Sequence, residues 1–156
     1  MKAKAIRLFE EAYRAQMSGE LEEAIRLYKA SIDTYPTAEA HTFLGWTYSF
    51  LGRLDLAIEE CKRAIEVDPD FGNPYNDIGA YLIELGRDDE AIPWLRKAME
   101  AKRYEAPHYP HYNLGRIWMQ KGMLKEAIAE FTKALEIEPE YTLAQETIRK
   151  LEAQLI

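Results

Sequence analysis

The chain has 156 residues, enough for one compact domain or one short array of repeats, but not for two large domains. With 47% hydrophobic and 30% charged residues, its composition is that of a folded protein rather than a disordered chain. The formal net charge of −7 argues against nucleic acid or an anionic membrane as a partner, because both attract basic surfaces.

The first residues form a charged amphipathic segment, unlike the apolar core of a signal peptide. No stretch approaches the roughly 18 consecutive apolar residues that indicate a membrane span. We therefore expect a cytoplasmic protein that does not associate with membranes. Cys61 is the only cysteine, so an internal disulfide and a thiolate zinc site are both excluded.

Four series of small residues recur in phase along the chain. The turn glycines Gly19, Gly52, Gly86 and Gly122 are separated by steps of 33, 34 and 36 residues. The same steps separate three further series, which are Ala12, Gly45, Gly79 and Gly115; Ala24, Ala57, Ala91 and Ala127; and Ser31, Ala64, Ala98 and Ala134. Because packed helices tolerate insertions less well than loops, the changes in length belong to the connections between units. The pattern predicts four units, at about residues 5–37, 38–71, 72–107 and 108–140.

Each unit is predicted to be a pair of helices joined at its turn glycine, because apolar residues follow helical spacing on both sides of it. Pro36, Pro69 and Pro139 end the second helix of three units, since proline lacks an N–H and restricts the residue before it. The third unit has Arg103 in that place, followed by a two-residue insertion. Residues 103–112 are therefore either an ordered elbow or a mobile rim. Residues 141–155 predict one more amphipathic helix that caps the array, with Leu143, Thr147, Leu151 and Leu155 on one stripe.

This pattern resembles the tetratricopeptide repeat (TPR) family, whose unit of about 34 residues reads W-x2-L-G-x2-Y, then A-x3-F, then P. The second unit matches with His41-x2-Leu44-Gly45-x2-Tyr48, Ala57-x3-Cys61 and Pro69, and the fourth with His111-x2-Leu114-Gly115-x2-Trp118, Ala127-x3-Phe131 and Pro139. The resemblance implies an all-α, right-handed superhelical solenoid of four helix-turn-helix repeats plus a C-terminal capping helix, forming a single domain over residues 1–156. It also implies that the first helix of each pair lines a concave groove that binds peptides or partner proteins.

The first helices carry a second stripe of residues that do not pack into their own unit. Seven aromatic residues lie on this stripe, where a water-facing helix normally carries charge. Large rings with few rotamers are the usual anchors of binding surfaces. The predicted partner-binding residues are Phe9, Tyr13, Phe43, Trp46, Phe50, Asn73, Asn76, Asp77, Tyr109, Tyr112, Asn113 and Arg116. Two alternatives stay open: Phe9, Phe43 and Trp46 fill gaps between neighbouring helices, and Asn76, Asn113 and Arg116 are merely solvated.

Some TPR cochaperones hold the acidic C-termini of heat-shock chaperones with a clamp of Lys, Asn, Asn, Lys and Arg. The corresponding positions hold Phe9, Tyr13, Phe43, Asn73 and Asp77, or, one unit further on, Thr42, Trp46, Asp77, Tyr109 and Asn113. Neither alignment supplies a cation, and Asp77 would repel a carboxylate. The resemblance therefore favours an apolar segment, helical or extended, over an acidic tail.

Other residues with chemical potential are interpreted as structural. His41 and His111 occupy the position of the family's packing tryptophan, and His108 completes no metal-ligand spacing, so neither a metal nor a cofactor is expected. Cys61 replaces an aromatic packing residue and is interpreted as a small buried hydrophobe. Glutamates in the second helices are interpreted as capping and solvating groups; they are Glu22, Glu23, Glu59, Glu60, Glu126 and Glu130.

No nucleophile or phosphate-binding motif can be named, so we do not expect an enzyme. The sequence favours a non-catalytic protein–protein interaction module that binds a partner peptide or helix in its aromatic groove. The alternative is a self-associating structural protein, a homo-oligomer formed through the cap helix or the groove. A third reading, RNA stacked on the groove aromatics, is opposed by the net charge and by four acids on the stripe, Glu10, Glu39, Asp77 and Glu84.

Overall fold

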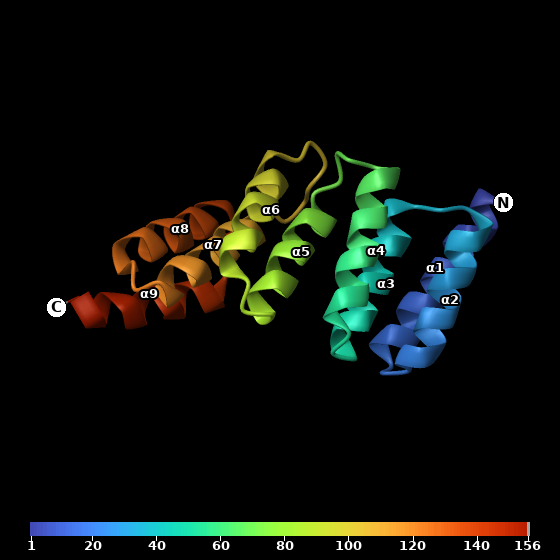
Figure 1. Ribbon diagram of the computed structural model, residues 1–156, viewed down its shortest axis with the longest axis horizontal. Coiled ribbons are helices and arrows are strands. Elements are labelled where there is room, and N and C mark those ends of the chain that lie inside the picture. The colour runs from blue at the N-terminus through green and yellow to red at the C-terminus, as the bar shows by residue number, and fades with distance from the viewer. Residues whose placement is uncertain (156) are drawn as a thin grey trace.

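The computed structural model describes residues 1–155, and nine α-helices make up almost all of that range. Four consecutive pairs are followed by a single helix, and the pairs succeed one another from the N-terminal to the C-terminal end of the molecule (Figure 1). The helices are α1 (Lys2–Met17), α2 (Leu21–Thr34), α3 (Ala38–Phe50), α4 (Leu54–Val67), α5 (Asn73–Glu84), α6 (Asp88–Glu100), α7 (His108–Gln120), α8 (Leu124–Ile137) and α9 (Thr142–Leu155). The predicted all-α solenoid is confirmed.

The predicted turns and helix ends are confirmed by the backbone. All four turn glycines have φ between +75° and +80°, a left-handed conformation that glycine adopts at little cost. Helices α2, α4 and α8 each end two residues before a proline, as the sequence predicts. Within residues 1–155, no helix combines the length and apolar character needed to cross a membrane.

The small residues inside the first helices mark places where the paired helices pack closely. At Gly115, an added Cβ would lie 2.6 Å from the ring of Phe131, which is itself fully buried in α8. A side chain at this position would force α7 and α8 apart. The period of the small residues is therefore the period of close helix packing.

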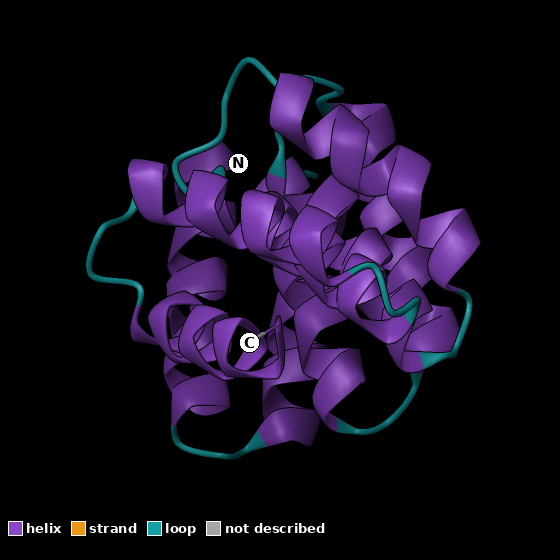
Figure 2. Ribbon diagram, turned by 90° about the vertical axis from the view of Figure 1, so that its left-hand side faces the viewer, coloured by secondary structure: helices purple, strands orange, loops and turns teal. Residues whose placement is uncertain are grey.

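The first helices of the pairs form the inner side of the solenoid. Each contacts the next, α1 with α3, α3 with α5 and α5 with α7, whereas the described residues show no comparable contact between successive second helices. Figure 2 looks along the array and shows the helices winding about its long axis, with the connecting loops at the periphery. Side chains of α1, α3, α5 and α7 that do not pack into their own pair therefore share one concave side.

The segment after α6 is an ordered elbow. The N–H of Arg103 donates to the carbonyl of Asp70 at 2.9 Å, and the N–H of Gly72 donates to the carbonyl of Arg103 at 3.0 Å. The Arg103 guanidinium lies 4.2 Å from the centre of the Phe71 ring and also pairs with Glu39 and Asp68. These contacts tie the end of the third pair to the end of the second.

Helix α9 packs differently from the stripe predicted for it. Its buried residues are Ala144 and Leu151, and Ile148 packs beside them against α8. Leu143 and Leu155, which the predicted stripe included, are 49% and 46% exposed. The prediction was wrong for these two leucines because the buried face of α9 runs through Ala144, Ile148 and Leu151, and Ile148 and Leu151 pack with Ala127 and Phe131 of α8.

Candidate partner-binding groove

Five predicted groove residues form one cluster on α1 and α3, the N-terminal aromatic cluster. The centre of the Phe43 ring lies 5.1 Å from that of Phe9, 5.8 Å from that of Tyr13 and 5.9 Å from that of Trp46. The centre of the Trp46 ring in turn lies 5.1 Å from that of Phe50. These separations lie within the range in which aromatic rings attract one another. The cluster is therefore a continuous aromatic surface across two neighbouring first helices.

The rings of the N-terminal aromatic cluster differ in exposure. Phe9, Phe43 and Trp46 are half-buried, and Phe9 also packs edge-on against the buried Tyr28, 5.6 Å between ring centres. Tyr13 and Phe50 remain 41% and 56% exposed. Phe9 and Phe43 thus fill the gap between α1 and α3, in keeping with the alternative that they pack between neighbouring helices. Tyr13 and Phe50 leave apolar surface exposed to water.

A group of polar residues on α5 and α7 follows the N-terminal aromatic cluster along the inner side. Asn113 donates to the Oδ1 of Asn76 at 3.0 Å, and Arg116 donates to the Oδ1 of Asn113 at 3.0 Å. Both asparagines are buried, so these bonds satisfy amide groups that would otherwise be costly to desolvate. Asn73 lies half-buried at the start of α5. The network links two successive first helices and fixes the position of Arg116.

Asp77 lies half-buried on α5, beside Asn76. Burial raises the pKa of its carboxyl to about 7, although the Asn76 amide acts in the opposite direction. Its charge also adds to the effect of burial in raising the pKa of the Tyr81 and Tyr104 hydroxyls. In the part of the chain that the structure describes, no ion pair includes Asp77. The inner side thus contains a desolvated carboxylate without a cationic partner.

A second aromatic group, the C-terminal aromatic cluster, comprises His108, Tyr109, Tyr112 and Tyr141. The ring of Tyr141 lies 5.2 Å from those of His108 and Tyr112 and 5.8 Å from that of Tyr109. Tyr109 is 44% exposed, whereas burial raises the pKa of the Tyr141 hydroxyl to about 12 and lowers the pKa of His108. Sequence reasoning missed Tyr141 and His108 as members of this surface, because Tyr141 precedes the last helix and no repeat position marks it.

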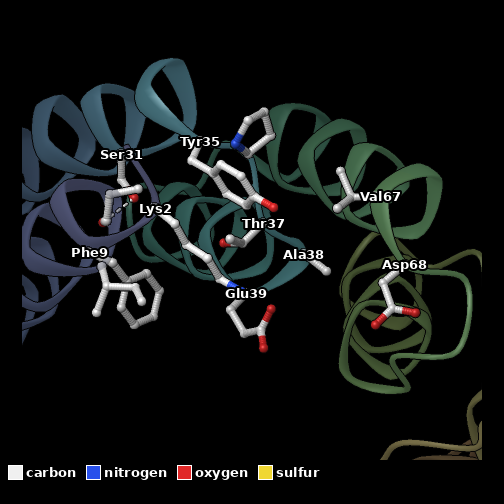
Figure 3. A pocket seen from close by; sticks show the side chains of 12 residues that line it. Lys2, Phe9, Ser31, Tyr35, Thr37, Ala38, Glu39, Val67 and Asp68 are labelled. Carbon is white, nitrogen blue, oxygen red and sulfur yellow. Dashed lines mark hydrogen bonds between the residues drawn. The ribbon is translucent and has the colours of Figure 1, made fainter.

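A pocket of about 450 Å³ opens beside the N-terminal aromatic cluster (Figure 3). Side chains from α1, the end of α2, the start of α3 and the end of α4 surround it. They include Lys2, Ile6, Phe9, Tyr35, Glu39 and Val67. The Lys2 ammonium lies 5.9 Å from the centre of the Tyr35 ring. No sequence signal marks this pocket, because it depends on how four separate segments meet.

Two histidine–glutamate pairs lie inside the helix pairs rather than on the groove. The Nδ1 of His41 lies 3.4 Å from Glu60, and that of His111 lies 2.9 Å from Glu130. Glu60 is buried and Glu130 half-buried, so the interpretation of these two glutamates as solvating groups was wrong. In both pairs the glutamate follows its histidine by 19 residues, so the repeat places the two side chains opposite each other. Among residues 1–155, no three His, Cys, Asp or Glu side chains are grouped to hold a metal ion.

Cys61 is fully buried on α4, in keeping with its interpretation as a small hydrophobe. Burial raises the pKa of its thiol well above the usual range, which disfavours the reactive thiolate.

The chain matches the tetratricopeptide repeat family model over residues 38–71, 75–103 and 108–141. It is 31% identical over 99 residues to the small glutamine-rich tetratricopeptide repeat-containing protein 2 of Mycosarcoma maydis. The matched residues make up 63% of this chain and 28% of that protein. The chain spans only 11% to 28% of the length of the first curated relatives it matches.

Two solved structures illustrate the shared fold. Pseudomonas aeruginosa PilF superposes with a TM-score of 0.90 at 22% identity, over 98% of this chain and 70% of that one. YrrB, described as a TPR protein with an unusual peptide-binding site, superposes with a TM-score of 0.70 at 23% identity, over 96% of this chain and 77% of that one. At these identities the likeness shows the fold alone. The repeat pattern, the helix pairs and the three family matches together establish that the chain belongs to the tetratricopeptide repeat family.

Proposed function

We propose that this chain is a non-catalytic binding module that captures an apolar segment of a partner protein along its inner side. One observation carries the proposal: large aromatic rings remain exposed on the first helices, at Tyr13, Phe50 and Tyr109. Exposure of an aromatic ring to water is unfavourable, and contact with a partner would remove that apolar surface from water. TPR proteins generally mediate protein–protein interactions, and the exposed rings are carried by the first helices α1, α3 and α7.

The two aromatic clusters suggest two anchoring places for one segment. The N-terminal aromatic cluster adjoins the pocket of about 450 Å³, which lies within the usual size range of ligand pockets and would accept a bulky apolar side chain. The C-terminal aromatic cluster offers the exposed face of Tyr109. Between them, the network of Asn76 and Asn113 holds the half-buried guanidinium of Arg116, whose N–H groups outside this network are the proposed donors to a peptide backbone.

The proposal is tested by selecting dodecapeptides from a random display library against the immobilised chain and measuring their dissociation constants by fluorescence anisotropy. Phe50→Ala and Tyr109→Ala should each weaken binding by about tenfold or more, because truncating an aromatic hot spot typically costs about 2 kcal/mol and about 1.4 kcal/mol is already tenfold. Both side chains are exposed, so neither substitution should unfold the protein. Leu56→Ala, at an exposed apolar residue of the second helix α4, is the matched control and should change affinity less than twofold. Equal losses in all three variants, or no retained peptide, would refute the proposal.

Self-association is a second candidate because Leu143 and Leu155 leave apolar surface exposed on α9. Light scattering after size exclusion, over a concentration series, separates the two functions. A dimer that Leu143→Ala and Leu155→Ala together dissociate would favour self-assembly through α9. A monomer at every concentration would exclude it and leave the groove for a foreign partner.

A further inference from the structure

The centre of the inner side differs in chemistry from its two ends. Asp77 of α5 holds the repeat position that Phe43 holds on α3 and Asn113 on α7, since each lies two residues before the small residue of its helix. One turn further along α5, Ala80 stands where α3 has Trp46 and α7 has Arg116. Beside the carboxylate, α5 therefore presents only a methyl group in place of a long side chain.

Two arginines, Arg116 of α7 and Arg103 of the elbow, are engaged with other residues. Arg116 donates to Asn113, and its charge opposes the rise that burial causes in the pKa of Tyr141, so its field acts at the C-terminal aromatic cluster. Arg103 is held by Asp68 and Glu39. No described lysine, arginine or histidine forms an ion pair with Asp77.

A half-buried carboxylate without a cation is an unfavourable arrangement in the free protein. Burial removes water from its oxygens, and its raised pKa, about 7, reflects that loss. A positive charge brought to the same place would meet the carboxylate in a medium where Coulomb attraction is stronger than in water. Two further acids of the inner stripe, Glu10 and Glu84, are exposed and add to the same negative field, whereas Glu39 pairs with Arg103.

We propose that Asp77 binds the ammonium or guanidinium of a lysine or arginine in the captured segment, so that the partner carries a basic residue between apolar anchors. This inference rests on the proposed function. The aliphatic stem of the basic residue would lie over Ala80, where α5 leaves room for it, and its charged end would reach the carboxylate. Charge complementarity thus selects among apolar segments that the aromatic clusters alone would not distinguish.

The geometry also predicts a spacing. Neighbouring packed helices lie about 10 Å apart, and an extended chain advances about 3.3 Å per residue. A segment that crosses from α3 to α5 therefore places its basic residue about three positions from the side chain that contacts the N-terminal aromatic cluster.

The test compares peptides selected from a random dodecapeptide library by three immobilised proteins: the wild-type chain, Asp77→Asn and Asp33→Asn. Asp33 is an exposed residue of the second helix α2, so its substitution changes the net charge equally but outside the groove. Wild type and Asp33→Asn should enrich lysine or arginine three positions from an aromatic or aliphatic residue. Asp77→Asn should lose that enrichment while retaining the apolar preference.

A second measurement isolates the pair itself. Replacing the selected lysine by norleucine should weaken binding to the wild type by about tenfold or more, the range for a hydrogen bond to a charged group, and should leave binding to Asp77→Asn unchanged. Selected peptides without basic residues, or an equal norleucine effect on both proteins, would overturn this inference and leave capture by the groove intact. Retention of no peptide by any of the three proteins would overturn both.

Discussion

The guanidinium of Arg103 donates two hydrogen bonds to one carboxylate oxygen of Asp68, from Nη2 at 2.7 Å and from Nε at 3.3 Å. Asp68 follows α4, and Arg103 stands where the third repeat lacks its closing proline. The other repeats end their second helix with proline, whereas the third ends in a tertiary contact that joins two repeats. A third bond, from Nη1 to Glu39 at 3.2 Å, extends the link to the first turn of α3.

Removal of this link should loosen the junction between the second and third repeats. Arg103 and its partners are partly exposed, and exposed ion pairs contribute little each, so Arg103→Ala should lower the free energy of unfolding by about 1 kcal/mol. Urea denaturation measures the change, with Lys102→Ala as the control for loss of a neighbouring positive charge. Molar salt should shrink the difference between wild type and Arg103→Ala. Equal stability of Arg103→Ala and Lys102→Ala would show that the link contributes nothing.

Gly72 should resist substitution because of Tyr104 rather than because of its backbone. A Cβ on Gly72 would lie 2.5 Å from the Tyr104 ring. Gly72→Ala should therefore displace the ring and cost about 1–3 kcal/mol in urea denaturation, the usual range for overpacking. In a Tyr104→Ala background the same substitution should cost much less. Additive costs in the double variant would mean that Tyr104 is not the obstacle.

The His41–Glu60 pair should be replaceable by two apolar residues but not by one. The first repeat has Leu8 and Leu27 at the corresponding positions. His41→Leu alone should cost about 1–3 kcal/mol, because it removes one partner of the buried Glu60 and leaves only Arg63, at 3.3 Å. His41→Leu with Glu60→Leu should bring the free energy of unfolding back to within about 1 kcal/mol of wild type. A double variant less stable than His41→Leu would contradict this expectation.

Asp77 should make the free protein less stable as the pH rises toward neutrality. Its folded-state pKa of about 7 exceeds the value of about 3.9 in an unfolded chain, so the folded state holds more protons between these values. The free energy of unfolding contributed by this group therefore falls from about pH 4 to about pH 7 and is constant above. Asp77→Asn should gain about 1–2 kcal/mol at pH 8, less than a fully buried carboxylate would give, and almost nothing at pH 4.

Urea denaturation at both pH values checks this, with Asp33→Asn as the exposed control. An Asp77→Asn gain that is the same at pH 4 and pH 8 would mean that the carboxylate is not destabilised by burial.

The period of the small residues was sufficient to predict every helix pair, because close contact between paired helices at positions such as Gly115 recurs once in each repeat. The same period placed the aromatic residues on the first helices. It left open whether Phe9 and Phe43 meet between neighbouring helices or face a ligand, since that depends on how those helices are oriented. The Arg103 elbow, the membership of Tyr141 in the C-terminal aromatic cluster and the rotation of α9 toward Ala144 all arise from tertiary contacts that no local pattern carries.

Affinity for one fluorescein-labelled peptide from the library tests the proposed groove most directly when both aromatic clusters are truncated together. Trp46→Ala combined with Tyr112→Ala should weaken binding by about a hundredfold or more, because each substitution removes an anchor in a different cluster. Trp94→Ala, on the second helix α6, is the matched control and should keep the wild-type affinity. Unchanged affinity in a double variant that retains its helical circular dichroism would contradict capture of the segment by the aromatic groove.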